Sequence, residues 1–140
     1  GKDTLVKDVE ISNAENWRKD HLKAIESAYR NTPYYEYYID AFKVIIQKDF
    51  RFLHELNWAI TAFLIDKFGL ITKINESTDS VPPQEENYTH ILHPKKDTGF
   101  KTAPYIQTFQ ERYGFINNPS ALDLLFNEGP NSITILTESY

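Results

Sequence analysis

Two side chains could serve as a base and its orienting acid. His21 follows Trp17 by four residues in a stretch whose apolar residues have helical spacing. A partly shielded imidazole held by a partner is a common general base. Asp123 could orient such a base. A simpler interpretation is favoured for each: His21 as a core histidine bonded to a backbone carbonyl, and Asp123 as the acidic half of a capping box with Ser120.

Other side chains could bind a substrate. Tyr34, Tyr38 and Phe42 share one face of an expected helix, and tyrosine joins an apolar ring to a polar tip, which suits a sugar or a protein interface. Arg30, just before them, could also contact substrate, and Lys95 in a basic cluster could bind a phosphate or carboxylate. The alternatives are core packing for the tyrosines and a solvated loop for Lys95.

Signals for a metal or a cofactor are weak. His90 and His93 are three residues apart, but a metal site needs a third ligand, so a polar surface loop is favoured. The chain has no Cys, which excludes thiolate ligands and disulfides. It has no phosphate-binding loop, no dinucleotide-binding glycine pattern and no nucleophile elbow. We therefore expect no metal and no cofactor.

The spacing of apolar residues, together with capping residues and glycines, predicts the elements that must position these side chains. They form a helix-rich α+β fold with a few short strands, as one domain over residues 1–140. Trp17 and Ile25 are expected in its core. Strands are expected at 4–11, 70–74, 88–92 and 132–137, and helices from the capping box at 12–15 to about 30, from 33 to about 47 with Thr32 as N-cap, from after 49 to Gly69, across 105–113, and from Ser120 to Gly129.

The first expected strand needs a partner, because unpaired backbone groups are costly when buried. It could pair with residues 70–74 or 132–137 within the chain. It could instead pair with a second copy of itself, which predicts a possible homodimer.

Composition excludes several classes of protein. The 140 residues carry a net charge of -5 and no basic face, which argues against a nucleic-acid partner. No apolar run reaches membrane-spanning length and no signal peptide is evident, so we expect a cytoplasmic protein without a membrane span. The chain begins with Gly1 and has no Met, from which we expect that a native N-terminal segment precedes it.

Four stretches of the sequence resemble the WbqC-like family. They occur in the family's order and cover most of the chain. Pro119 departs from the pattern, since an apolar residue is usual there, and nothing matches the family's N-terminal part. The stretches are residues 17–35 apart from Leu22 and Lys23, then His93-Pro94-Lys95, then Tyr105 to Gln107 with Phe109 followed by Tyr113-Gly114-Phe115-Ile116, and lastly SALDLLFNEGP at 120–130.

This resemblance implies a role in bacterial surface-polysaccharide synthesis, because family members occur in O-antigen gene clusters. It also implies a transferase that attaches glycine to a sugar. The substrate would then be a small or sugar-linked molecule. The alternative is a non-catalytic module that binds glycan or protein through its aromatic surface. A pocket joining His21 to an acidic partner favours the enzyme, whereas exposed tyrosines without a pocket favour the binding module.

Overall fold

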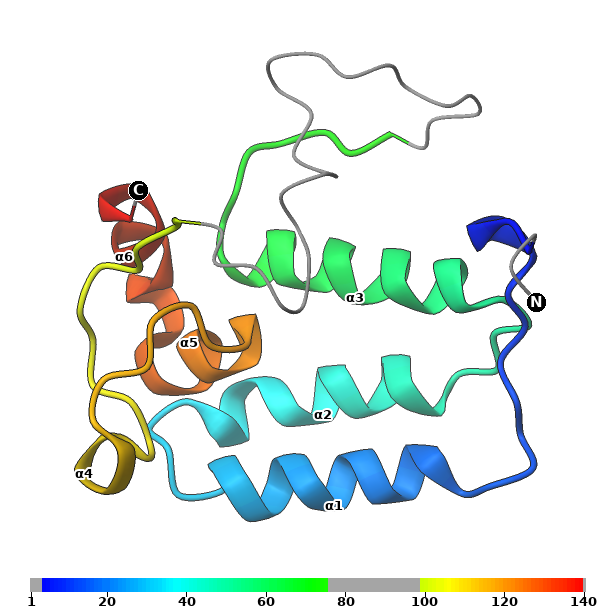
Figure 1. Cartoon of the computed structure of the whole chain (residues 1–140), viewed down its shortest axis with the longest axis horizontal. Helices are drawn as coiled ribbons and strands as arrows, with labels where there is room; N and C mark the ends of the chain where they lie inside the picture. The colour runs from blue at the N-terminus through cyan, green and yellow to red at the C-terminus, as the bar shows by residue number, and fades with distance from the viewer. Residues whose placement is uncertain (1–3, 76–98, 140) are drawn as a thin grey trace.

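The computed structural model describes residues 4–75 and 99–139 (Figure 1). Among these residues the only β-type pairing is an isolated antiparallel bridge between Glu10 and Phe52. The expectation of an α+β fold is therefore wrong, because the described part of the chain is helical and has no strand. The elements, with η marking a 3-10 helix, are η1 (Val6–Asp8), α1 (Trp17–Tyr29), α2 (Tyr35–Gln47), α3 (Leu53–Lys67), α4 (Gln110–Tyr113), α5 (Ala121–Glu128), η2 (Gly129–Asn131) and α6 (Ser132–Glu138).

The segments expected as strands take other conformations. Residues 4–11 contain η1, and their backbone pairs with the start of α3: the Ile11 N–H donates to the Arg51 carbonyl at 2.9 Å, and the Leu53 N–H donates to the Val9 carbonyl at 2.8 Å. Residues 70–74 have no regular structure, and 132–137 lie in α6. The expected pairing of 4–11 with either segment is therefore wrong. The expected strand at 88–92 lies outside the described residues.

The first three helices run antiparallel in chain order (Figure 1), and α2 packs against both α1 and α3. Four α2 side chains at helical spacing are almost fully buried: Tyr35, Ile39, Phe42 and Ile46. Trp17 and Ile25 on α1 were expected in the core, but both are only half-buried and pack against its edge. The α2 stripe is thus the centre of the core.

Helix starts differ from the sequence expectation. Helix α1 begins at Trp17, and the Ser12 hydroxyl accepts the Ala14 N–H at 3.3 Å outside the helix. Helix α2 begins at Tyr35 with Tyr34 as its N-cap, and the Thr32 hydroxyl donates to the Tyr29 carbonyl at 2.7 Å. The expected glycine after α3 is confirmed: Gly69 has a φ of 68°. The helix expected across 105–113 is confined to α4.

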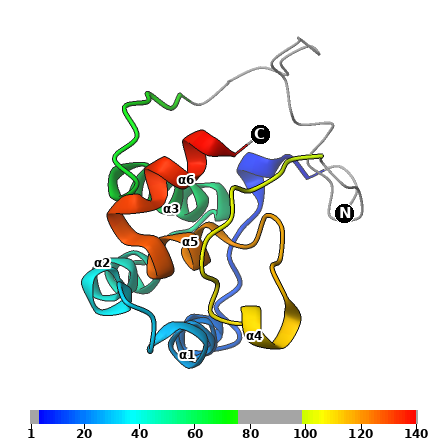
Figure 2. The same cartoon turned by 90° about the vertical axis from the view of Figure 1, so that its left-hand side faces the viewer.

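Helix α5 joins the C-terminal elements to α2. The Ser120 hydroxyl accepts the Leu122 N–H at 3.3 Å, which confirms the expected N-cap. Figure 2 shows α5 near the centre of the described part of the molecule. The Phe126 carbonyl accepts the Tyr34 N–H at 3.0 Å, so the end of α5 is tied to the turn before α2. Four consecutive α5 residues are buried: Asp123, Leu124, Leu125 and Phe126.

Candidate functional site

A cavity of about 750 Å³, which we call the polar pocket, lies where three distant segments meet. The turn between α1 and α2 forms one wall, the residues that lead into α4 form another, and α5 contributes one side chain. Most of its lining side chains are uncharged amides and hydroxyls. The lining residues are Asn31, Thr32, Pro33, Ile106, Gln107, Thr108, Gln110, Glu111 and Asn127.

Asp123 is a buried acid that supports one wall of this pocket. Asp123 is only 5% exposed, and its Oδ1 accepts the Tyr105 hydroxyl at 2.8 Å. Asn127, one helical turn further along α5, donates its amide to the Asp123 backbone carbonyl at 2.8 Å and to Oδ1 at 3.3 Å. Asp123 therefore holds the side chain of a pocket residue in place.

Two tyrosines donate toward the Asp123 carboxylate. Burial, followed by the charge of Asp123 and a hydrogen bond to it, raises the pKa of Tyr29 to about 12. Burial also raises the pKa of Tyr105, and the hydrogen bond to Asp123 and its charge add to that increase. Because both phenols keep their protons at neutral pH, they act as donors to Asp123.

Gln107 fixes the loop beside the pocket. Its amide nitrogen donates to the Ile116 carbonyl at 2.7 Å, and its amide oxygen accepts the Ile116 N–H at 2.8 Å. The Gln107 amide thus bonds both the N–H and the carbonyl of Ile116, as the backbone of a paired β-strand would. These two bonds hold Ile116 against the segment before α4. Sequence reasoning did not single out Gln107 as a site residue. Gln107 could have been found, because it lies in the stretch from Tyr105 to Phe109 that carries the family resemblance.

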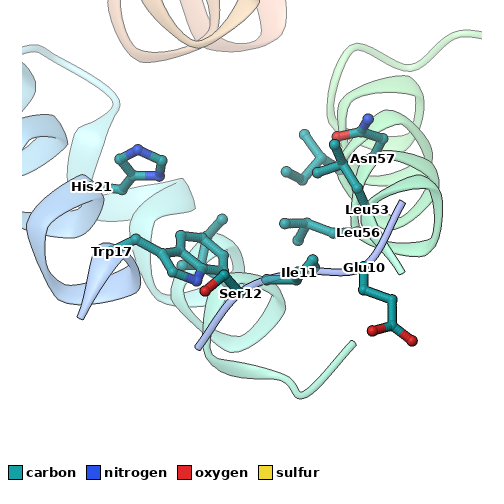
Figure 3. A pocket seen from close by; sticks show the side chains of 10 residues that line it. Glu10, Ile11, Ser12, Trp17, His21, Leu53, Leu56 and Asn57 are labelled. Carbon is teal, nitrogen blue, oxygen red and sulfur yellow. The ribbon is translucent and has the colours of Figure 1, made fainter. Parts of the chain in front are cut away.

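A second cavity of about 430 Å³, the apolar pocket, lies between α1 and α3 over the α2 core (Figure 3). His21 stands on its α1 wall and Asn57 on its α3 wall. Its lining residues are Glu10, Ile11, Ser12, Trp17, His21, Ile46, Leu53, Leu56, Asn57 and Ile60.

His21 is exposed at this pocket, and its ring contacts the Trp17 ring edge-on at a centroid distance of 5.5 Å. The acid among the lining residues is Glu10. Its carboxylate is bonded to Arg51 at 2.9 Å, and Figure 3 shows it pointing away from His21. The structure therefore places the candidate base in an aromatic and aliphatic setting.

The other residues singled out from sequence lie apart. Asp123 supports the polar pocket, whereas His21 lines the apolar pocket, so the two do not meet in one cavity. Asp123 makes bonds to distant side chains, and its interpretation as half of a capping box overlooked them. Arg30 is exposed at the end of α1, while Tyr34 and Tyr38 are half-buried at α2. Lys95, His90 and His93 lie outside the described residues.

Two further observations concern metals and membranes. Among residues 4–75 and 99–139, no three His, Asp or Glu side chains are grouped as metal ligands. No helix in that part of the chain is both long and apolar enough to cross a membrane.

The described part of the chain is thus a helical fold that contains the polar pocket and the apolar pocket. The chain matches the WbqC-like protein family over residues 1–103 and belongs to that family, as the sequence resemblance indicated. The matched part contains Asn31, Thr32 and Pro33, whereas the other residues of the polar pocket follow it along the chain. No curated protein and no solved structure matches the chain.

Proposed function

We propose that the chain acts in the synthesis of bacterial surface polysaccharide, such as O-antigen, and binds a sugar-linked intermediate in its polar pocket. The observation that carries this proposal is the lining of that pocket. Amide and hydroxyl side chains from three segments converge there, and such groups form the hydrogen bonds that sugar hydroxyls require. Membership of the WbqC-like family supports the surface-polysaccharide setting.

Glycyl transfer is the reaction that we propose for the bound sugar. An oxygen or nitrogen of the sugar would form a bond to the carbonyl carbon of an activated glycyl group, and the bond from that carbon to its leaving group would break. The proton of the attacking atom would pass to a base. His21, at the apolar pocket, is the proposed base for a reacting group that extends into that pocket. Asp123 is the second proposed catalytic residue, and it acts at the polar pocket through Asn127 and does not orient His21.

Four further residues are proposed substrate contacts, and they differ in their surroundings. Tyr34 lies at the turn between α1 and α2, which also contributes to the polar pocket, and Tyr38 follows one helical turn later. Arg30 is exposed immediately before that turn. Lys95 remains a proposal from sequence.

A non-catalytic module that binds glycan or protein is the second candidate function. One observation favours it: Glu10, the acid at the apolar pocket, is paired with Arg51, so it does not orient His21. A base without an orienting partner gives less catalysis than a held one. The two candidates share the polar pocket and differ only in whether His21 takes a proton.

Binding is tested by titrating the isotope-labelled chain with neutral monosaccharides and following backbone amide signals by NMR. We expect shifts at residues 106–111 and 127, with dissociation constants on the order of millimolar. Asn127→Ala should abolish these shifts. Asn131→Ala is the matched control, because Asn131 is an exposed amide on the next turn that donates only to Glu128 among the described contacts. Saccharide shifts that avoid the polar pocket, or that survive Asn127→Ala, would refute the proposal.

Catalysis is tested separately with a glycyl thioester as donor and an amino sugar as acceptor, with the product detected by mass spectrometry. The enzyme hypothesis expects a glycyl-sugar product that is lost in His21→Ala while saccharide binding persists. Binding without product in the unaltered chain would support the module.

A further inference from the structure

The hydrogen bonds behind the polar pocket have a fixed direction that starts at Asp123. The negatively charged carboxylate can only accept, so the Tyr105 hydroxyl donates to it at 2.8 Å. The proton of the Tyr105 hydroxyl is therefore committed to Asp123. Each member of this chain of hydrogen bonds therefore has one permitted orientation.

The same carboxylate sets the orientation of Asn127. Its amide nitrogen faces the carbonyl and carboxylate of Asp123, so its amide oxygen points the other way, toward Thr108. The Thr108 hydroxyl consequently donates to that oxygen at 3.2 Å. The proton of Thr108 is used in this bond, and its oxygen lone pairs are left for a ligand.

The opposite wall of the pocket has the same polarity. The Thr32 hydroxyl donates its proton to the Tyr29 carbonyl, which leaves its oxygen as an acceptor. Glu111 adds a carboxylate, and none of the residues that line the pocket is Lys, Arg or His. Gln110 accepts the Gln107 N–H at 3.3 Å, so its amide nitrogen is a donor on a wall otherwise rich in acceptors.

We infer that the polar pocket binds a protonated amine carried on a hydroxyl-bearing ring, which is the chemistry of an amino sugar. This inference rests on the proposed function and specifies its substrate class. The ammonium would pair with Glu111, and ring hydroxyls would donate to the oxygens of Thr32, Thr108 and Asn127. An anionic sugar is disfavoured, because a phosphate would meet the Glu111 carboxylate and acceptor oxygens without a cation to offset them.

The test compares three probes on the labelled chain by NMR titration: glucosamine, glucose and glucose 6-phosphate. Glucosamine should bind at the polar pocket about tenfold more tightly than glucose, a difference typical of one favourable charge contact. Glu111→Gln should reduce that preference to near onefold. The matched control is Glu138→Gln, an exposed acid on α6, which should leave the preference intact.

A second variant tests the acceptor at the pocket wall. Thr108→Val keeps the side-chain shape and removes the oxygen, and it should weaken binding of both glucosamine and glucose several-fold. Thr61→Val is its control, since the Thr61 hydroxyl bonds only within α3 among the described contacts. Preserved affinity in Thr108→Val would contradict the acceptor role.

The outcomes separate this inference from the proposed function. If glucose and glucosamine bind the polar pocket equally, or if Glu111→Gln leaves the preference unchanged, the amine inference is wrong and the sugar-binding function stands. Tightest binding by glucose 6-phosphate would also overturn the inference. If none of the three probes shifts the pocket signals, both proposals fail.

Discussion

Asp123 shows how a local pattern can miss a residue's main contact. In sequence, its place three residues after Ser120 indicates a capping box, and Ser120 does cap α5. The carboxylate, however, is buried and accepts the Tyr105 hydroxyl. The local spacing predicted the cap correctly. The partner lies 18 residues earlier in the chain, and spacing within α5 carries no information about it.

The tyrosines around Asp123 make stability depend on pH in the alkaline range. The pKa of Tyr29 rises from 10.0 in its reference state to about 12 in the folded chain, mainly through burial. For a group with a raised folded pKa, the contribution to stability is complete below the unfolded pKa and is lost as pH rises through the folded pKa. The free energy of unfolding should therefore fall between pH 10 and about 12, and Tyr105 contributes in the same direction.

Urea unfolding at several pH values on either side of 10 measures this fall. Tyr29→Phe should make the decline shallower, and Tyr105→Phe should do the same. Tyr37→Phe is the control, because Tyr37 is 80% exposed. An equally steep decline in the Tyr29 and Tyr105 variants would show that neither phenol is held protonated by the fold.

At the scale of elements, the helical spacing of apolar residues predicted helices correctly, whereas the alternation of apolar and polar residues predicted a strand that the structure does not have. The apolar positions of α2 and α3 predicted both helices, because a single face of each is buried against the core. Residues 132–137 alternate in polarity and were expected as a strand. In the structure, Ser132 and Ile135 face the core from α6, and a separation of three residues is helical. In a segment this short, both periods fit the same apolar residues.

The junction of α5 and η2 depends on Gly129. Its φ of 51° is unfavourable for other residues, and a Cβ there would overlap the ring of Tyr34. Gly69 also has a positive φ, but a Cβ there would meet no atom within 4 Å. We expect Gly69→Ala to cost about 1 kcal/mol from backbone strain alone. Gly129→Ala should cost about 2 kcal/mol more, because the ring must shift.

Denaturant unfolding of the two variants measures the difference. Adding Tyr34→Ala to Gly129→Ala should recover part of the additional loss, since the obstructing ring is then absent. Equal losses at Gly69 and Gly129 would mean that α5 can move away from Tyr34 without cost, and that the contact does not fix this junction.

On the scale of the whole molecule, the candidate site could not be assembled from the sequence. Sequence reasoning named His21 as a candidate base and Asp123 as a residue that could orient a base. The structure separates them, because α1 contributes Trp17 and His21 to the apolar pocket, whereas its C-terminal turn leads to the polar pocket. The polar pocket joins residues 31–33 to residues 106–111 and 127. Such proximity results from long-range packing around α2 and leaves no local pattern in the chain.

Because α2 packs against α1, α3 and α5, both pockets depend on one core, and they should be lost together on unfolding. Ile39, 2% exposed at the centre of α2, is the residue to test. We expect Ile39→Ala to cost about 3 kcal/mol, the usual loss for a buried isoleucine.

The Trp17 indole signal reports the apolar pocket, and the Gln107 side-chain amide signals report the polar pocket. NMR spectra in increasing urea should show both disappearing at one midpoint, in the unaltered chain and at a lower urea concentration in the variant. Val44→Ala, at an exposed α2 position, is the control and should leave the midpoint nearly unchanged. Separate midpoints for the two signals would mean that the pockets belong to independently unfolding units, and that α2 does not couple them.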